Sequence, residues 1–369
     1  MNQRIAIIGA GPAGLAAAAE ALRLGMKAAL FERGRVGEGI RCAEGFFDPL
    51  RLLAPPEAGI RFKVQSLYFR AKKEYEFSTQ GLRLWIIDRA QWQQHRAKRL
   101  RQGGVEIREG EAISRQNYPL LREEFDWVID ASGVPPVTSL VYGFRDYYLP
   151  HSLVTAQYVL SGDFTHLANS IKVGFSPDYR GYFWIFPKSE TRASVGLAFL
   201  AEEYGPRDLD RLWTCLHREM AAEALAEAKI IERSGGLCPA KMLPRLVWDN
   251  VILVGDAAGL TSPLHGGGID MALLSGREAV RAIARGGVEG YRKGLEKLFK
   301  PRLVLEKELV RLWSASSFEE VEGVLAGVHS LLKGKGIGPL LPLSRHLLPK
   351  AYLFFHCWQA LQGGLASGR

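Results

Sequence analysis

Three glycines near the start of the chain, Gly9, Gly11 and Gly14, have the spacing of a turn that holds a dinucleotide. An apolar strand precedes the turn, an alanine-rich helix follows it, and a second strand ends at Glu32. The first glycine allows the tight turn, the second lets backbone approach a pyrophosphate, and the third lets the helix pack closely. The helix N-terminus offers free N–H groups to phosphates, and the Glu32 carboxylate can accept hydrogen bonds from ribose hydroxyls. A plain βαβ unit is the alternative interpretation.

A second motif, far along the chain, indicates which dinucleotide is bound. Residues 251–254 are an apolar strand, and Gly255, Asp256 and two alanines follow directly. An aspartate at the end of a buried strand can accept hydrogen bonds from a polyol, and FAD carries a ribityl chain whereas NAD does not. The glycine-rich turn at residues 265–268 then opens a helix, whose N-terminus would stabilise negative charge on a reduced flavin ring. The sequence therefore predicts FAD as the cofactor; a simple helix cap is the alternative role of Asp256.

Alternation over residues 182–186 predicts an aromatic surface on one face of a strand. Tyr182, Trp184 and Phe186 occupy every second position, so their rings would share a face while the two residues between them point the other way. Such a face could line an apolar slot over the flavin, and ordinary sheet core is the alternative. Pro187 lacks an N–H group and cannot continue a central ladder, so the strand is expected to end there.

The elements that must position these motifs change character along the chain. Short strands and a helix over residues 89–101, capped by Asp88, continue the nucleotide-binding sheet as far as residue 130. A strand pair is expected at 62–79 and a helix at 207–228. Four segments rich in Tyr, Phe and Val predict an antiparallel meander at residues 152–160, 170–175, 181–186 and 192–199.

The predicted fold class is α/β (α+β overall), with a Rossmann-like FAD-binding domain, an inserted antiparallel catalytic sheet and a helical C-terminal part. The FAD-binding domain is expected to comprise residues 1–60, 83–145 and 236–290, the catalytic sheet 61–82 and 146–235, and the helical region 291–369. Within the last region, residues 337–368 are rich in Leu, Phe and Trp. They could cover a lipid tunnel, contact a membrane interface or pack on the FAD-binding domain.

Composition narrows the classes of function. Four scattered cysteines without a Cys-x-x-Cys pair argue against a disulfide framework, a zinc site or an iron–sulfur cluster, and fit a reducing cytoplasm. No metal is expected. The chain has a net charge of +9, but its Lys and Arg residues are spread along the sequence and are not interleaved with aromatic residues. This pattern favours an anionic cofactor, substrate or membrane surface over nucleic acid as the binding partner. No apolar run approaches the roughly 20 residues that span a bilayer. A cytoplasmic protein with peripheral contact at the inner face of the membrane is expected.

Together these segments resemble the FAD-dependent para-hydroxybenzoate hydroxylase-like superfamily, and within it the geranylgeranyl reductase family. The family features are Arg-Cys-Ala-Glu-Gly at 41–45, Tyr-x-Trp-x-Phe-Pro at 182–187 and Gly-Gly-Leu-Cys-Pro at 235–239. The resemblance implies an oxidoreductase that saturates C=C bonds of an isoprenoid or similar apolar lipid by hydride transfer from flavin N5. NAD(P)H or a ferredoxin-like protein would be the electron donor. An FAD-dependent monooxygenase of an aromatic or quinone substrate is the alternative, although Ala-Ser-Gly at 131–133 replaces the Asp-Gly of many such hydroxylases.

The resemblance also assigns expected roles to single residues. The expected catalytic residues are Cys42, Tyr182, Trp184 and His265, and the expected substrate-binding residues are Tyr182, Trp184, Phe186 and Pro187. Passive packing is an equal alternative for Cys42, and a turn histidine bonded to backbone is the alternative for His265. The expected FAD-binding residues are Gly9, Gly11, Pro12, Ala13, Gly14, Glu32, Arg33, Arg41, Cys42, Ala43, Arg89, Gly255, Asp256, Pro263, Gly266, Gly267, Gly268 and Ile269.

Overall fold

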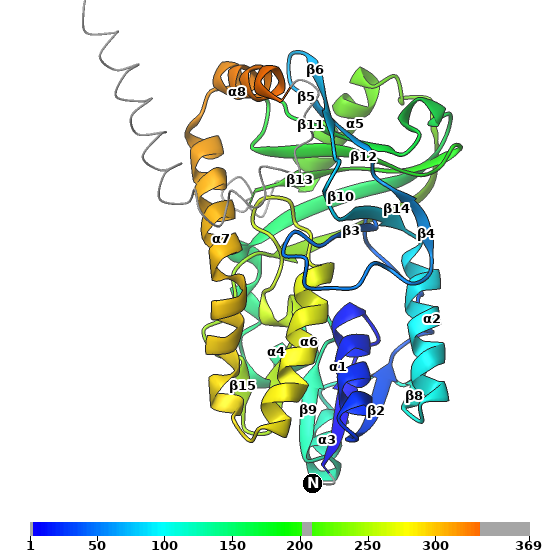
Figure 1. The fold of residues 1–369 in the computed structure, drawn as a ribbon, viewed down its shortest axis with the longest axis vertical. Helices are drawn as coiled ribbons and strands as arrows, with labels where there is room; N and C mark the ends of the chain where they lie inside the picture. Colours follow the sequence, from blue (N-terminus) through cyan, green and yellow to red (C-terminus); the bar gives the residue numbers. More distant parts are fainter. Residues whose placement is uncertain (1–2, 201–208, 333–369) are drawn as a thin grey trace, which may run out of the picture.

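The computed structural model describes residues 3–200 and 209–332. A parallel sheet with helices on both faces forms the lower half of the molecule in Figure 1, and a larger, mostly antiparallel sheet lies above it. Helix α7 (Tyr291–Ala315) runs along one side of both layers, and helix α8 (Phe318–Leu331) lies across the top. The architecture is the predicted α/β fold with an added antiparallel sheet.

The parallel sheet has the order β15-β16-β9-β1-β2-β8, with only the edge strand β15 antiparallel to its neighbour. Both of its faces are covered, as parallel sheets require. Ile5 and Ile7 of β1 pack into the core on one face, and Ala6 and Ile8 pack into the core on the other. The strands are β1 (Arg4–Ile8), β2 (Lys27–Glu32), β8 (Glu106–Glu109), β9 (Trp127–Asp130), β15 (Val247–Trp248) and β16 (Val251–Leu253).

Three helices cover one face of this sheet and two shorter helices cover the other. The first group is α1 (Pro12–Arg23), α2 (Arg89–Gln102) and α6 (Ile269–Ala284), and the second is α3 (Tyr118–Glu124) and α4 (Val137–Tyr142). The predicted cap of α2 is confirmed, because the Asp88 carboxylate accepts a hydrogen bond of 2.9 Å from the Gln91 N–H. Helices α1 and α6 pack closely at Gly276, where a side-chain carbon would overlap the carbonyl oxygen of Ala13.

The upper sheet has seven strands in the order β14-β10-β13-β12-β11-β5-β6. Helix α5 (Leu209–Ala222) packs against its outer face through a cluster of buried apolar side chains. A small third sheet has the order β3-β7-β4. The strands are β3 (Gly45–Phe47), β4 (Ile60–Lys63), β5 (Ser66–Arg70), β6 (Glu74–Ser78), β7 (Leu84–Ile87), β10 (Ser152–Ser161), β11 (Ser170–Gly174), β12 (Gly181–Ser189), β13 (Arg192–Phe199) and β14 (Lys229–Pro239).

The predicted meander is correct for β11, β12 and β13, but not for the whole sheet. β10 pairs with β13 and β14 rather than with β11, and β11 pairs in parallel with the distant β5. The helix expected over 207–228 ends at Ala222, within the residues described. Ala224 has a left-handed backbone with φ of 56°, and the Leu225 N–H bonds back to the Met220 carbonyl. The chain then enters β14, which the sequence pattern did not predict.

The expectation that β12 ends at Pro187 is wrong. The strand continues to Ser189, and Pro187 pairs with Ala193 of β13. The ladder tolerates proline here because β11 pairs with β12 only as far as Ile185, so Pro187 lies where β12 is paired on one side alone. The register becomes irregular directly afterwards, between Pro187 and Ser189.

Other expectations concern the limits of the domains and the end of the chain. β14 crosses the predicted boundary between residues 235 and 236, so the division into domains stays a prediction. The expected helices after residue 291 are present as α7 and α8. Residues 337–368, expected to cover a tunnel or contact a membrane, lie outside the described residues. Within residues 3–200 and 209–332, none of the helices has the length and apolar character needed to cross a bilayer.

Candidate active site

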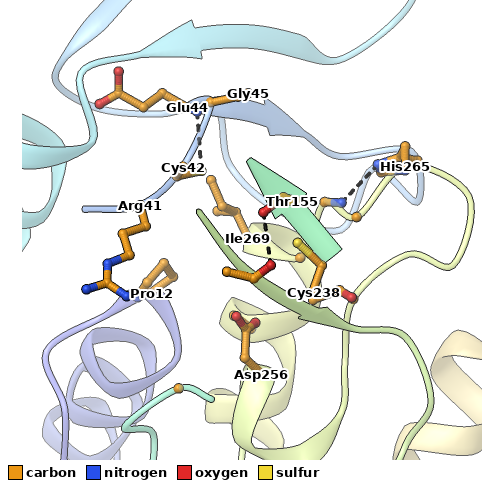
Figure 2. Close-up of a pocket in the computed structure, with 18 of the residues that line it drawn as sticks. Pro12, Arg41, Cys42, Glu44, Gly45, Thr155, Cys238, Asp256, His265 and Ile269 are labelled. Carbon is orange, nitrogen blue, oxygen red and sulfur yellow. Dashed lines mark hydrogen bonds between the residues drawn. The ribbon is translucent and has the colours of Figure 1, made fainter. Parts of the chain in front are cut away.

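A cavity of about 1010 Å³ lies where the carboxyl ends of the parallel strands meet the inner face of the seven-stranded sheet. Figure 2 shows its centre, with Asp256 pointing into it from below and the loop that carries Cys42 passing above. Of the predicted site residues, Gly14, Pro187, Gly255 and Pro263 do not line it. It brings together Gly9, Gly11, Pro12, Ala13, Glu32, Arg33, Arg41, Cys42, Ala43, Arg89, Tyr182, Trp184, Phe186, Asp256, His265, Gly266, Gly267, Gly268 and Ile269.

The glycine turn between β1 and α1 has the geometry that its spacing predicts. Gly9 has a φ of 100°, and a side-chain carbon there would lie 2.6 Å from the Ala131 carbonyl oxygen. A side-chain carbon on Gly14 would overlap the carbonyl oxygen of Gly9, whereas one on Gly11 would meet nothing within 4 Å. The space beside Gly11 therefore belongs to the cavity, and a side chain at this position would occupy it. Helix α1 begins here without a side-chain cap, so its first N–H groups are available to a ligand.

Glu32 does more in the structure than the sequence indicated. It ends β2 at the cavity wall, as expected. Its carboxylate accepts hydrogen bonds from the N–H groups of Ala10, at 2.7 Å, and Gly34, at 3.3 Å. Glu32 therefore also holds the glycine turn in place.

Asp256 lies on the short 3-10 helix Gly255–Ala258 that follows β16, and its side chain faces the cavity (Figure 2). It makes no cap bond there, so the alternative role as a helix cap is not what the structure shows. Among residues 3–200 and 209–332, no group donates a hydrogen bond to the Asp256 carboxylate. Burial raises its pKa to about 6, against the opposing effect of the Arg89 guanidinium. A buried acceptor of this kind suits the hydroxyls of a polyol.

A glycine-rich turn leads into α6 on the opposite side of the cavity. Gly266 has a φ of 62°, and α6 starts after Gly268 without a side-chain cap. His265 Nδ1 accepts the Gly267 N–H at 3.2 Å, and the Tyr182 hydroxyl donates to the His265 carbonyl at 2.7 Å. The turn is thus fixed to β12. Its free N–H groups and the dipole of α6 favour negative charge in the cavity.

His265 faces a buried ionic cluster that the sequence analysis missed. Its Nε2 lies 3.2 Å from Arg302 Nη2 and 3.7 Å from Glu306 Oε1. Arg302 also pairs with Asp270 at the start of α6 and with Glu306 at 2.6 Å. Burial lowers the pKa of His265 to about 4, so the imidazole is neutral at neutral pH. The one signal available in the sequence was the four-residue spacing of Arg302 and Glu306 on a helix.

The loop that carries Cys42 is anchored through Glu44. The Glu44 N–H donates to Cys42 Sγ at 3.2 Å, with Glu44 in a left-handed conformation at φ of 68°. The buried Glu44 carboxylate accepts the Arg89 N–H at 3.1 Å and pairs with Lys188, which follows the aromatic motif. The loop is therefore tied both to α2 and to β12. Glu44 is a positioning residue that composition alone could not indicate.

The predicted alternation along β12 is confirmed. Tyr182, Trp184 and Phe186 line the cavity, while Phe183 and Ile185 are fully or almost fully buried in the core beneath α5. The aromatic face continues into an apolar arm of the cavity that the sequence analysis missed. Its walls come from four separate elements: β5 and β11 supply Leu67, Phe69, Ile171 and Val173, and α7 and α8 supply Leu309, Leu312, Trp313, Val321, Val324 and Leu325.

Helix α8 closes this arm and is held there by two acidic side chains, Glu322 and Glu319. The Glu322 carboxylate accepts the N–H groups of Lys72, at 2.9 Å, and Lys73, at 3.3 Å, together with the Tyr75 hydroxyl. Lys72 also pairs with Glu319 at 2.8 Å. The helix has no fully buried residue of its own, so these contacts with the β5–β6 turn hold it over the cavity.

Comparison with known proteins agrees with this geometry. The FAD binding domain family matches residues 4–77. The chain is 31% identical over 316 residues to digeranylgeranylglycerophospholipid reductase 2 of Methanopyrus kandleri, with 77% of each chain covered. The chain belongs to the geranylgeranyl reductase family. A second relative, digeranylgeranylglycerophospholipid reductase of Methanocella arvoryzae, is 28% identical over 313 residues, which cover 76% of this chain and 77% of the relative.

Solved structures share the fold of this geranylgeranyl reductase family member. A geranylgeranyl bacteriochlorophyll reductase-like protein of Thermoplasma acidophilum superposes with a TM-score of 0.75 at 21% identity, covering 88% of this chain and 91% of that one. The halogenase CndH superposes with a TM-score of 0.63 at 18% identity, covering 83% and 81%. The protein is an FAD-dependent oxidoreductase. Two uncapped helix N-termini, the open space at Gly11 and the Asp256 carboxylate, which has no hydrogen-bond donor among the described residues, fit that cofactor.

Replacing Asp256 with alanine is expected to weaken FAD binding by about 10- to 100-fold, since a hydrogen bond to a charged group contributes about 1.5–3 kcal/mol. The apo protein should not lose thermal stability, because the substitution removes a buried carboxylate that accepts no hydrogen bond from the part of the chain that the structure describes. Titration of the apo variant with FAD measures the effect. Asp146→Ala, at an exposed site outside the cavity, is the matched control. Unchanged affinity in Asp256→Ala would contradict the assignment.

FAD affinity is also expected to depend on pH through Asp256. Burial holds its pKa above the ordinary value, so the folded apo protein keeps the proton that an unfolded chain would release, up to about pH 6. Hydroxyl donors favour the carboxylate, so binding should release that proton. Affinity should therefore rise with pH, by at most about tenfold per unit, and level off above about pH 6. Titrations across this range test the slope, and Asp256→Asn should remove it; an equal slope in that variant would assign the titration to another group.

Proposed function

We propose that the protein saturates C=C bonds of a polyprenyl lipid of the digeranylgeranylglycerophospholipid type. One observation carries the proposal: a single cavity joins the dinucleotide-binding turn to a long apolar arm. Relatives that cover more than three quarters of this chain are named as reductases of that lipid class. Burial of a prenyl chain in the arm would contribute about 0.8 kcal/mol for each CH₂ group removed from water.

Some residues of the protein would hold the cofactor, and others would orient the lipid. When bound in its reduced form, FAD supplies the hydride from N5. The glycine turn and Arg41 would hold the pyrophosphate, and Asp256 the ribityl hydroxyls. The N-terminus of α6 would favour the negative charge of a reduced ring, because its first residues line the cavity. Tyr182 and Trp184, on β12, confine the alkene beside the ring.

The second alkene carbon needs a proton from the cavity wall. Cys42, whose thiol can release a proton, is the proposed source, and His265 is the proposed relay, because a neutral imidazole gives up one proton only while its other nitrogen takes up another; both residues line the cavity. His265 would act as a neutral imidazole, in keeping with its lowered pKa. The proposed electron donor is NAD(P)H or a ferredoxin-like protein. Because the substrate is a membrane lipid and the chain is basic, with a net charge of +9, we also propose peripheral contact with the inner face of the membrane.

Product analysis under two atmospheres tests the proposed reaction. The protein, loaded with FAD and reduced chemically with dithionite, is incubated with digeranylgeranylglycerophospholipid without oxygen. Mass spectrometry should show the addition of two hydrogen atoms per double bond, and protein-free reduced FAD is the control. A product that forms only in air and carries an added oxygen atom would contradict the proposal and favour the monooxygenase alternative.

A further inference from the structure

A chain of hydrogen bonds runs behind Trp184, across four neighbouring strands. The Trp184 indole N–H donates to Ser194 Oγ at 3.1 Å. The Ser194 hydroxyl donates to Gln157 Oε1 at 3.2 Å, and Gln157 Nε2 donates to Ser234 Oγ at 2.9 Å. The four residues lie on β12, β13, β10 and β14, which are adjacent in the sheet. Every donor in the chain points the same way, from the aromatic face toward β14.

Burial makes each of these bonds necessary. Trp184 is 5% exposed, Ser194 is 0% exposed and Gln157 is 6% exposed. An indole N–H can only donate, so an acceptor must be provided once the ring is buried. Ser194 is the acceptor, and Gln157 Oε1 accepts the hydrogen bond of its buried hydroxyl and so fixes the direction of that hydroxyl. Loss of either partner leaves a buried polar group unsatisfied.

The absence of a side chain at Gly196 gives the Trp184 ring its place against β13. Gly196 lies directly opposite Trp184 in the β12–β13 ladder, and a side-chain carbon there would overlap the six-membered ring. The ring therefore lies over bare backbone of β13. Tyr182 stands beside it, with 5.9 Å between the ring centroids. Together with the bond to Ser194, these contacts hold the indole at one angle against the cavity.

Packing alone does not require this chain of hydrogen bonds, because an apolar ring such as phenylalanine could fill the same wall without buried polar partners. The hydrogen-bonded chain also reaches the cavity, because Gln157 lines the cavity beside Thr155. A wall residue held by directional bonds is suited to guide a prenyl chain, which lacks polar groups. Such a chain can be oriented only by the shape of the slot around it.

We propose that Ser194 and Gln157 are positioning residues that fix the Trp184 indole and thereby determine how completely the polyprenyl chain is saturated. The inference rests on the proposed function. A polyprenyl chain carries a double bond in every isoprene unit, and each bond must reach the same place as the chain slides through the arm. A fixed ring presents each bond alike, whereas a loose ring lets partly reduced chains leave.

A double-mutant cycle separates positioning from ordinary packing. Ser194→Ala and Trp184→Phe should each lower kcat by about tenfold, with a smaller change in KM, and should accumulate partly saturated lipid. Because Ser194 acts through the indole N–H, the double variant should be no slower than Trp184→Phe alone. Ser78→Ala, an exposed serine on β6 of the same sheet, is the control for loss of a hydroxyl.

Two further readouts complete the test. The indole N–H resonance that disappears in Trp184→Phe should shift in Ser194→Ala, while FAD content stays unchanged in both. If Ser194→Ala does not fold, Gln157→Met breaks the next hydrogen bond of the chain and should give the same product pattern. Multiplicative loss of kcat in the double variant would overturn the inference and leave the reductase assignment standing. A wild-type protein that saturates no lipid would overturn both.

Discussion

Replacing Trp184 with alanine is expected to lower lipid turnover on the order of 100-fold, since misplacement of a reacting group by about 1 Å has effects of that size. The side chain borders the cavity, so its removal widens the slot and lets the alkene move away from the flavin position. The FAD-binding glycines lie on other elements, so flavin content and the flavin spectrum should stay nearly intact. Steady-state turnover and the flavin content of the purified variant measure the two effects.

Phe183→Ala is the matched control, one residue away and on the opposite face. Phe183 is fully buried beneath α5, and truncation of such a ring costs about 3–5 kcal/mol of folding free energy. The variant should therefore show a lowered melting temperature and normal turnover per folded molecule. If both variants lost FAD together, or if Trp184→Ala turned over normally, the aromatic face would be sheet core and not a substrate wall.

The second large effect is expected at the glycine turn, where Gly14→Ala and Gly11→Ala should fail for different reasons. A methyl group on Gly14 would overlap the Gly9 carbonyl oxygen, and backbone cannot yield as a flexible side chain does. Overpacking typically costs about 1–3 kcal/mol, and this site lies at the severe end. We expect Gly14→Ala to lower the melting temperature of the apo protein and to bind no FAD.

Gly11→Ala should leave the apo fold nearly as stable, within about 1 kcal/mol, because the added methyl meets nothing within 4 Å. The methyl would occupy the space that a pyrophosphate needs, so FAD affinity should fall by about 10- to 100-fold, the equivalent of one charge-assisted hydrogen bond. Thermal melts without FAD, followed by FAD titration, separate the two variants. Equal melting temperatures for both would show that α1 does not pack on β1 as described.

Features that depend on a few neighbouring residues could be predicted from the sequence. The turn from Gly9 to Gly14, the end of β2 at Glu32 and the alternation along β12 are all set by local geometry. So is the Asp256 side chain at the end of a buried strand. Each of these lies where the motif spacing placed it, at the cavity.

Features that depend on distant partners could not be predicted in this way. Pro187 continues its strand because β11 stops pairing before it, which no local pattern reveals. β11 pairs on one side with β5, about a hundred residues earlier in the chain, and the apolar arm combines side chains from both strands with α7 and α8. The ionic cluster at His265 likewise needs Arg302 from α7. Tertiary pairing decides all of these contacts, whereas periodicity reports only single elements.

Reoxidation of the bound flavin by lipid, in the absence of oxygen, tests the central claim most directly. The FAD-loaded protein is reduced with one equivalent of dithionite and mixed anaerobically with digeranylgeranylglycerophospholipid, and the absorbance of oxidised flavin is followed. We expect the oxidised band to return as one double bond is saturated for each reduced flavin, more slowly in Trp184→Ala than in wild type. A flavin that stays reduced with lipid present, and is reoxidised only when air is admitted, would contradict the account.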